Sequence, residues 1–237
     1  MAESSPMPPE IRDNAAARAP HPLDSYLSLL KPLTIGLAAV LMAFAFLKLG
    51  GEVAEGDTRS FDTRLLHAAQ ALRAEAPWLA EVMRDLSGLG SMIVLTLFTV
   101  ATVGYLALVR ARATAILVAI SVAMGSVFVS LLKNAFGRLR PDTAFSEVVV
   151  SGLSFPSGHT SMSAIVFLTL GALIASTRTR LRERAYILAG ASLLMLLVGM
   201  SRVALGVHWA TDVLGGWAFG AAWAMAWLLL AHQVNRR

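Results

Sequence analysis

The sequence predicts an all-α, polytopic membrane protein with six transmembrane helices and amphipathic interfacial helices in the first outer loop. Three observations support this fold class: 56% of the 237 residues are hydrophobic, only 15% are charged, and long apolar runs recur along the chain. Soluble domains carry charge on about a quarter of their residues. A helix of about 20 apolar residues crosses the hydrocarbon core of a bilayer, and it satisfies its own backbone hydrogen bonds, as lipid requires.

The N-terminal stretch 1–30 is rich in Pro, Ala and Ser and predicts a mobile cytoplasmic tail. The six-helix membrane domain is then expected over residues 31–237. The first apolar run is long and is followed by GGEVAEGD rather than a cleavage site, so no signal peptide is expected. The apolar segments lie at about 33–49, 90–109, 113–132, 159–177, 185–203 and 212–231.

The connection at about 50–89 predicts helices that lie at the membrane surface. Apolar residues recur there at helical spacing on both sides of a break at Pro77. These residues are Phe61, Leu65, Leu66, Ala69, Leu72, Leu79, Val82, Met83 and Leu86.

The basic residues predict the orientation in the membrane. With the N-terminus in the cytoplasm, eleven of the 20 Lys and Arg residues fall on the cytoplasmic side, including those of the tight loops at 110–112 and 177–184. Short basic loops remain in the cytoplasm. We therefore expect an integral protein of the plasma (bacterial inner) membrane with both termini in the cytoplasm. The net charge of +5 is scattered between apolar runs, so we expect membrane lipids as neighbours and no nucleic-acid partner.

Three polar stretches stand out against the apolar background, and the predicted topology places all three on the outer side. They are K-N-A-F-G-R-L-R-P at 133–141, F-P-S-G-H-T-S at 155–161 and S-R-V-A-L-G-V-H-W-A-T-D at 201–212. Lys133, Arg140 and Arg202 supply three cations at helix ends. Each alone is typical of a side chain that reaches for the interface. Together, beside two histidines, they favour an oxyanion such as phosphate.

Residues Ser157 and Gly158 precede a predicted helix, with Ser157 as its N-cap. Free N–H groups at a helix N-terminus bind anions, so both residues are candidate phosphate ligands. Alone, this pattern also fits a simple turn before a capped helix.

His208 and Asp212 are four residues apart and would share one face of a helix. The carboxylate can hold one imidazole nitrogen and leave the other free to attack, which predicts His208 as a nucleophile. An isolated pair of this kind is more often a structural hydrogen bond, but the neighbouring cations favour catalysis. His159 is then the candidate acid that protonates the leaving alkoxide.

The pattern K-x6-R-P, P-S-G-H and S-R-x5-H-x3-D resembles the signature of the type-2 phosphatidic acid phosphatase superfamily. All eleven fixed positions match: Lys133, Arg140, Pro141, Pro156, Ser157, Gly158, His159, Ser201, Arg202, His208 and Asp212. The resemblance implies a phosphatase that needs no metal or other cofactor and forms a phosphohistidine on His208. It also implies lipid phosphates or pyrophosphates as substrates, such as phosphatidic acid, phosphatidylglycerol phosphate or undecaprenyl pyrophosphate.

Alternative functions are compatible with the same residues. A lipid phosphotransferase would use the same phosphoenzyme, and a non-catalytic binder or transporter of anionic lipids would need the cations but not both histidines. A vanadate-dependent haloperoxidase is disfavoured, because a membrane-embedded pocket suits an amphiphile. The oligomeric state stays open, since Gly215, Gly216 and Gly220 allow close helix packing within one chain or between chains.

Overall fold

The computed structural model describes residues 22–148 and 150–234, so residues 1–21 of the expected tail at 1–30 lie outside them. The described residues form eight α-helices and a 3₁₀ turn at Thr143–Phe145. The helices are α1 (Pro22–Glu55), α2 (Arg59–Glu75), α3 (Trp78–Gly88), α4 (Met92–Leu108), α5 (Arg112–Phe136), α6 (Gly158–Ser176), α7 (Leu181–Ala204) and α8 (Ala210–Val234). Helix α1 therefore takes in residues 22–30, where the sequence indicated tail. Pro22 suits the first helical turn, because that turn needs no N–H donor there.

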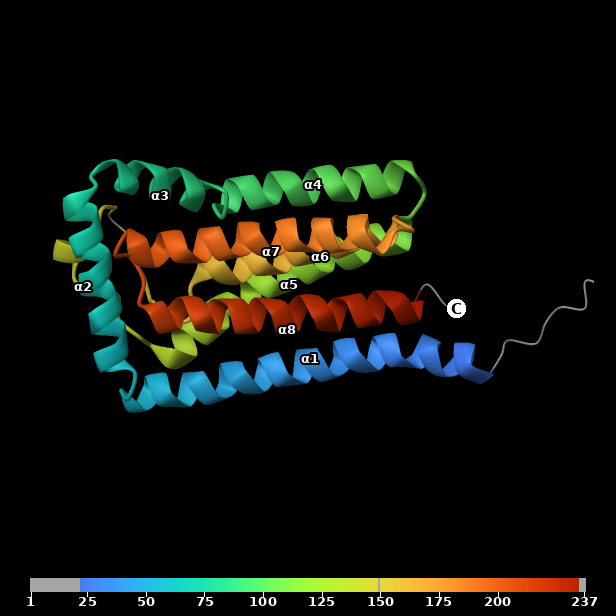
Figure 1. Ribbon diagram of the computed structural model, residues 1–237, viewed down its shortest axis with the longest axis horizontal. Coiled ribbons are helices and arrows are strands. Elements are labelled where there is room, and N and C mark those ends of the chain that lie inside the picture. The colour runs from blue at the N-terminus through green and yellow to red at the C-terminus, as the bar shows by residue number, and fades with distance from the viewer. Residues whose placement is uncertain (1–21, 149, 235–237) are drawn as a thin grey trace, which may run out of the picture.

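The prediction of six transmembrane helices is confirmed. The helical stretches long and apolar enough to cross a membrane are Pro32–Glu55, Trp78–Leu108, Arg112–Phe136, Gly158–Ser176, Leu181–Ala204 and Ala210–Val234. The second of them joins α3 to α4, so it starts earlier than the predicted 90–109. In Figure 1, α3 runs in the direction of α4 instead of across the end of the bundle.

Helix α2 runs across one end of the bundle, transverse to the long helices (Figure 1). Its apolar face was predicted from the spacing of residues such as Phe61 and Leu72, and the structure turns both outward, with 41% and 57% of each residue exposed. The buried residues of α2 are Asp62, Leu66 and Arg73. The helix therefore presents two charged residues to the protein and much of its apolar surface to the surroundings.

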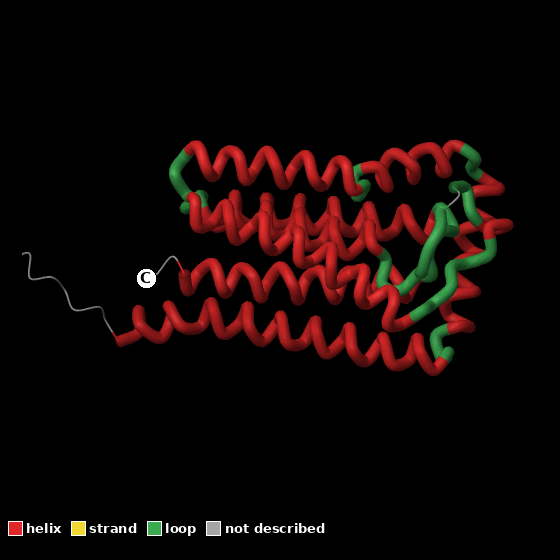
Figure 2. Tube along the Cα trace, turned by 180° about the vertical axis from the view of Figure 1, so that it is seen from behind, coloured by secondary structure: helices red, strands yellow, loops and turns green. Residues whose placement is uncertain are grey.

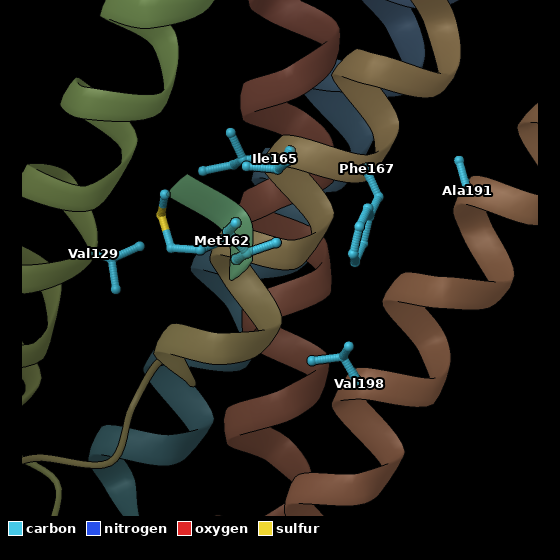
Figure 3. Close-up of a cluster of buried hydrophobic side chains, with 8 residues drawn as sticks. Val129, Met162, Ile165, Phe167, Ala191 and Val198 are labelled. Atoms are coloured by element: carbon cyan, nitrogen blue, oxygen red, sulfur yellow. The ribbon is translucent and has the colours of Figure 1, made fainter. Parts of the chain in front are cut away.

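Helix α6 lies at the centre of the bundle and packs against α5, α7 and α8. Its Met162 and Ile165 lie between Val129 of α5 and Val198 of α7, as Figure 3 shows. Such a buried core fixes the height and rotation of α6. The residue at the start of this helix, Gly158, is therefore held in place by the packing of the turns that follow.

Helix α8 approaches α6 closely because of its glycines. A Cβ atom on Gly216 would lie 2.9 Å from the Cβ of Thr160, and one on Gly220 would lie 2.6 Å from the Cβ of Ala164. These glycines thus serve packing within the chain. The N-terminal end of α1 and the C-terminal end of α8 lie at the same end of the bundle (Figure 1). The α5–α6 connection folds over the other end, beside α2 (Figure 2).

Candidate active site

The three polar stretches meet at the end of the bundle that α2 crosses. A cavity of about 230 Å³ there is lined by six of the eight predicted site residues: Lys133, Arg140, Gly158, His159, Arg202 and His208. Lys133 lies in the last turn of α5, Arg202 in the last turn of α7, and His159 in the first turn of α6. The other two predicted residues, Ser157 and Asp212, are buried behind the wall of the cavity.

His208 lies in the connection before α8, which starts at Ala210, so the pair it forms with Asp212 is not carried on one helix as predicted. The contact exists nevertheless, with His208 Nδ1 at 3.2 Å from Asp212 Oδ2. The same Oδ2 accepts hydrogen bonds from the Trp209 amide at 2.9 Å and from Ser154 Oγ. Asp212 therefore both caps the start of α8 and holds the imidazole.

The other imidazole nitrogen faces a cation. His208 Nε2 lies 2.9 Å from Arg140 Nη1, which also donates to the Val207 carbonyl at 2.8 Å. A guanidinium can only donate, so Nε2 accepts here and carries a lone pair. The proton of the neutral ring then belongs on Nδ1, where it points to the Asp212 carboxylate. This tautomer leaves Nε2 as the nitrogen able to attack.

Burial sets the charge of His208. Desolvation lowers its pKa to about 3, although the hydrogen bond to Asp212 acts in the opposite direction. The ring is therefore neutral at pH 7, which is the form with a free lone pair. Burial also lowers the pKa of Arg140, but a guanidinium still carries its charge at pH 7.

The other two cations, Lys133 and Arg202, have N–H groups that could donate to a bound anion. Lys133 Nζ donates to the carbonyls of Leu153 and Ser154, at 2.7 and 3.3 Å. Arg202 is 5% exposed, and Nη1 donates to Ser87 Oγ, while Nε is buried and has no partner among the described residues. A buried donor without a partner costs free energy. An anion in the cavity would relieve that cost.

The start of α6 agrees only partly with the sequence prediction. Ser157 is the N-cap residue, but its side chain makes no capping bond and instead accepts from Thr160 Oγ1 at 2.9 Å. Its amide donates to the Asp212 carbonyl at 3.0 Å, so that N–H is occupied. Gly158 does line the cavity. The free amides of the first helical turn therefore start at Gly158.

Sequence reasoning missed a second polar network behind Asp212. Arg138 donates from Nη1 to Asp212 Oδ1 at 2.8 Å and to Thr211 Oγ1 at 2.8 Å. Its Nη2 donates to Asp62 Oδ2 at 2.6 Å. The signal available was a second arginine two residues before Arg140 and an acid, Asp62, one helical turn before Leu65 and Leu66.

A glycine turn delivers His208 to the cavity. Gly206 has φ +70°, and a Cβ atom there would lie 2.0 Å from the carbonyl oxygen of Phe145. A side chain is therefore excluded both by the backbone conformation and by the neighbouring chain. This position fell within the variable part of the predicted motif.

Among residues 22–148 and 150–234, no group of three or more His, Asp or Glu side chains is placed to hold a metal ion together. The cavity instead gathers two imidazoles and several cations. Its remaining wall is mainly apolar and includes Met92 and Leu95 of α4, Val129 of α5 and Met162 of α6. Phosphate chemistry beside an apolar surface is what this combination supports.

Comparisons with known proteins agree with this geometry. A sequence model of the PAP2 superfamily matches residues 114–236. Phosphatidylglycerophosphatase B of Bacillus subtilis is 34% identical over 179 residues, which cover 74% of this chain and 85% of that protein. Lipid A 1-phosphatase of Rhizobium johnstonii is 36% identical over 110 residues, 43% of this chain and 41% of that protein.

A solved structure agrees as well. The crystal structure of a transmembrane PAP2 type phosphatidylglycerolphosphate phosphatase from Bacillus subtilis aligns with a TM-score of 0.74 at 28% identity. The alignment covers 84% of this chain and 97% of that one. The phosphatases among these relatives support the assignment of this chain as a lipid phosphate hydrolase. The chain belongs to the PAP2 superfamily.

Proposed function

We propose that this protein hydrolyses lipid phosphate monoesters or pyrophosphates through a phosphohistidine on His208. The observation that carries the proposal is the position of His208, with Nδ1 held by Asp212 and Nε2 at the cavity beside Arg140. An imidazole fixed on one side and presented on the other to a cation-lined cavity is arranged for nucleophilic attack on phosphorus. Lys133 and Arg202 supply further positive charge around the same space.

In the first step, the Nε2 lone pair attacks the phosphorus while the bond to the lipid oxygen breaks. Lys133, Arg140, Arg202 and the Gly158 amide stabilise the phosphoryl oxygens. The proton on His208 Nδ1 stays with the ring, and Asp212 balances the positive charge that develops on it. His159 donates a proton to the leaving oxygen.

In the second step, water attacks the phosphohistidine. His159, now neutral, accepts a proton from that water, the N–P bond breaks, and phosphate leaves with His208 restored. The roles of His159 as acid and then base follow from microscopic reversibility. A bound phosphate places negative charge beside the His159 ring, which favours the protonated form needed for the next turnover.

The cavity wall supports a lipid as substrate. Met92, Leu95, Val129 and Met162 give it an apolar side next to the cations. An amphiphile can place its phosphate among the cations and its first methylene groups against this wall. Phosphatidylglycerol phosphate and lipid A are the substrate classes suggested by the names of the relatives, and phosphatidic acid and undecaprenyl pyrophosphate share the same phosphate chemistry.

We also propose that the site faces the outer side of the plasma membrane. The basic stretches at 110–112 and 177–184 lie at the opposite end of the bundle from α2 (Figure 1), and the cavity lies at the α2 end. Short basic loops stay in the cytoplasm. Both termini would then lie in the cytoplasm.

Trapping of the phosphoenzyme tests the proposal. Purified protein in detergent is mixed with radiolabelled phosphatidic acid, quenched within milliseconds, and assayed for acid-labile, base-stable protein phosphate. We expect such phosphate in the wild type and none in His208→Ala, while His159→Ala accumulates it from an activated aryl phosphate. Labelled protein in His208→Ala would falsify the assignment of the nucleophile. A panel of lipid phosphates on the wild type then ranks the substrates.

A further inference from the structure

A buried network joins α2 to the candidate catalytic pair. Asp62 is 1% exposed, although it lies on a helix at the surface of the bundle. Its Oδ1 accepts from the Thr211 amide at 2.9 Å, and its Oδ2 accepts from Thr211 Oγ1 at 2.7 Å and from Arg138 at 2.6 Å. Both oxygens of this carboxylate therefore accept hydrogen bonds within the protein.

Arg138 connects this carboxylate to that of Asp212. Its two terminal nitrogens divide between them, Nη2 to Asp62 and Nη1 to Asp212 Oδ1 at 2.8 Å. The side chain is 15% exposed and also lies over the Trp209 ring, 5.5 Å from its centroid. A planar guanidinium held on both edges can move little, so the Asp212 carboxylate bound to it has a fixed orientation.

The orientation matters because Asp212 uses its other oxygen for His208. Oδ1 points to Arg138 and Oδ2 to His208 Nδ1, so rotation of the carboxylate would change both bonds together. We infer that Asp62 and Arg138 are positioning residues of this enzyme, which set the angle and the effective charge of Asp212 and through it the nucleophilicity of His208. The inference rests on the proposed function, since it needs His208 to be the nucleophile.

The charges explain why the two residues should act as a pair. With both present, Asp62 and Arg138 cancel, and Asp212 alone provides the negative charge that stabilises the developing imidazolium. Loss of the Asp62 charge leaves the positive charge of Arg138 to offset that of Asp212. Asp212 then offers less net negative charge to the developing His208 imidazolium. Loss of Arg138 leaves two buried carboxylates close together without the cation between them, which is costly. Loss of both charges restores the original net charge around Asp212.

The experiment is a double-mutant cycle with Asp62→Asn and Arg138→Gln, read as the single-turnover rate of phosphoenzyme formation from radiolabelled phosphatidic acid. We expect each single variant to lose roughly tenfold to a hundredfold in this rate and in kcat, with KM changed less than about threefold. The double variant should lose roughly tenfold less than the product of the single losses. The Gln amide can still donate to Asp212, which is why the pair is changed to neutral amides.

Two matched controls separate positioning from a general loosening of α2. Arg73→Gln removes another buried charge of the same helix, one that donates to the Ala204 and Phe145 carbonyls, pairs with Glu147 at 3.2 Å and does not touch Asp212. Arg59→Gln removes an exposed arginine that lines a second cavity, of about 340 Å³, together with Asp62 and Arg138. Arg73→Gln should lower thermal stability as much as Asp62→Asn yet change kcat less than about threefold. Arg59→Gln should change neither.

The outcomes are distinct. Additive losses in the cycle, or equal losses of kcat in Arg73→Gln and Asp62→Asn, overturn the positioning role while His208→Ala remains inactive. Phosphoenzyme in His208→Ala overturns the proposed function, and the inference with it. Where Asp62→Asn does not fold, Thr211→Val keeps every charge and removes one hydroxyl from the network. It should slow phosphoenzyme formation about threefold, and an unchanged rate contradicts the inference.

Discussion

Arg140 Nη1 lies 2.9 Å from His208 Nε2, so the cation holds the very nitrogen that attacks in the proposed mechanism. The same guanidinium is anchored by the carbonyls of Val207 and Gly152, at 2.8 and 3.0 Å. These anchors keep the charge beside the nucleophile in the absence of substrate. An arriving phosphate oxygen can then replace the imidazole as the partner of Nη1 and leave the lone pair free.

Replacement of Arg140 by lysine tests this relationship. Lysine keeps the charge but cannot reach the two carbonyls and the phosphate at once, so Arg140→Lys should lower kcat/KM by roughly ten- to a hundredfold. Initial rates of phosphate release from phosphatidic acid in mixed micelles measure the effect. Arg59→Lys is the matched control and should stay within about twofold, because Arg59 does not line this cavity. Equal values for both variants would remove Arg140 from the phosphate site.

His159→Ala tests the acid. With a lipid alkoxide as leaving group, the variant should lose roughly 10² to 10⁴ in the single-turnover rate of phosphoenzyme formation, because the alkoxide then departs without a proton. With p-nitrophenyl phosphate, whose leaving group needs no proton, the loss should be much smaller. The comparison of the two substrates is the measurement. Met200→Leu, at an exposed position that does not line the cavity, should affect both substrates within about twofold. Equal losses on both substrates in His159→Ala contradict the acid role.

The buried state of His208 makes stability depend on pH. Its pKa is about 3 in the folded protein, while an unfolded imidazole titrates near 6.5. The unfolded state therefore binds the proton first as pH falls, so stability is complete above about 6.5 and is lost between there and the folded pKa. At pH 5 the loss is about 2 kcal/mol relative to pH 7.5.

The measurement is thermal unfolding in detergent at pH 7.5 and pH 5, in parallel with His208→Gln, which lacks this titration. Between pH 7.5 and pH 5, the wild type should lose about 2 kcal/mol more of its unfolding free energy than the variant loses. A constant difference at the two pH values would show that His208 has an ordinary pKa in the folded state.

Much of the fold could be predicted from the sequence, because each helix is long and its apolar character is continuous. The meeting of Lys133, His159 and Arg202 could also be predicted, since each lies at a helix end and the helices alternate in direction. The sequence was less informative about what each face of a helix contacts. The spacing of Phe61 and Leu72 identified an apolar face of α2 but not whether protein or membrane lies against it.

The Asp62–Arg138 pair could not be predicted for a related reason. Its members are 76 residues apart, and they meet only because α2 folds back across the end of the bundle. No local pattern encodes that crossing. The fate of the Ser157 amide is similar, because its acceptor belongs to Asp212, on a helix that packs against α6 by tertiary contact.

The packing of α8 on α6 gives a test of stability. Gly220→Ala would place its Cβ 2.6 Å from both the Ala164 Cβ and the Ser161 carbonyl oxygen. The helices must then move apart, and we expect a loss of about 1–3 kcal/mol. Gly104→Ala in α4 is the matched control, because nothing lies within 4 Å of its Cβ position. Thermal unfolding should show it equal to or more stable than the wild type, and similar behaviour of the two variants would contradict the packing argument.

The proposed orientation is open to a direct test, because the chain contains no cysteine. Single cysteines introduced by Ser60→Cys, at the α2 end of the bundle, and by Thr179→Cys, in the α6–α7 connection, both lie at exposed positions. A membrane-impermeant maleimide added to intact spheroplasts should label Ser60→Cys at once, and Thr179→Cys only after permeabilisation. The reverse pattern would place the cavity on the cytoplasmic side. A phosphatase site facing that side would act on lipids of the inner leaflet, so the labelling also decides which membrane leaflet supplies the substrate.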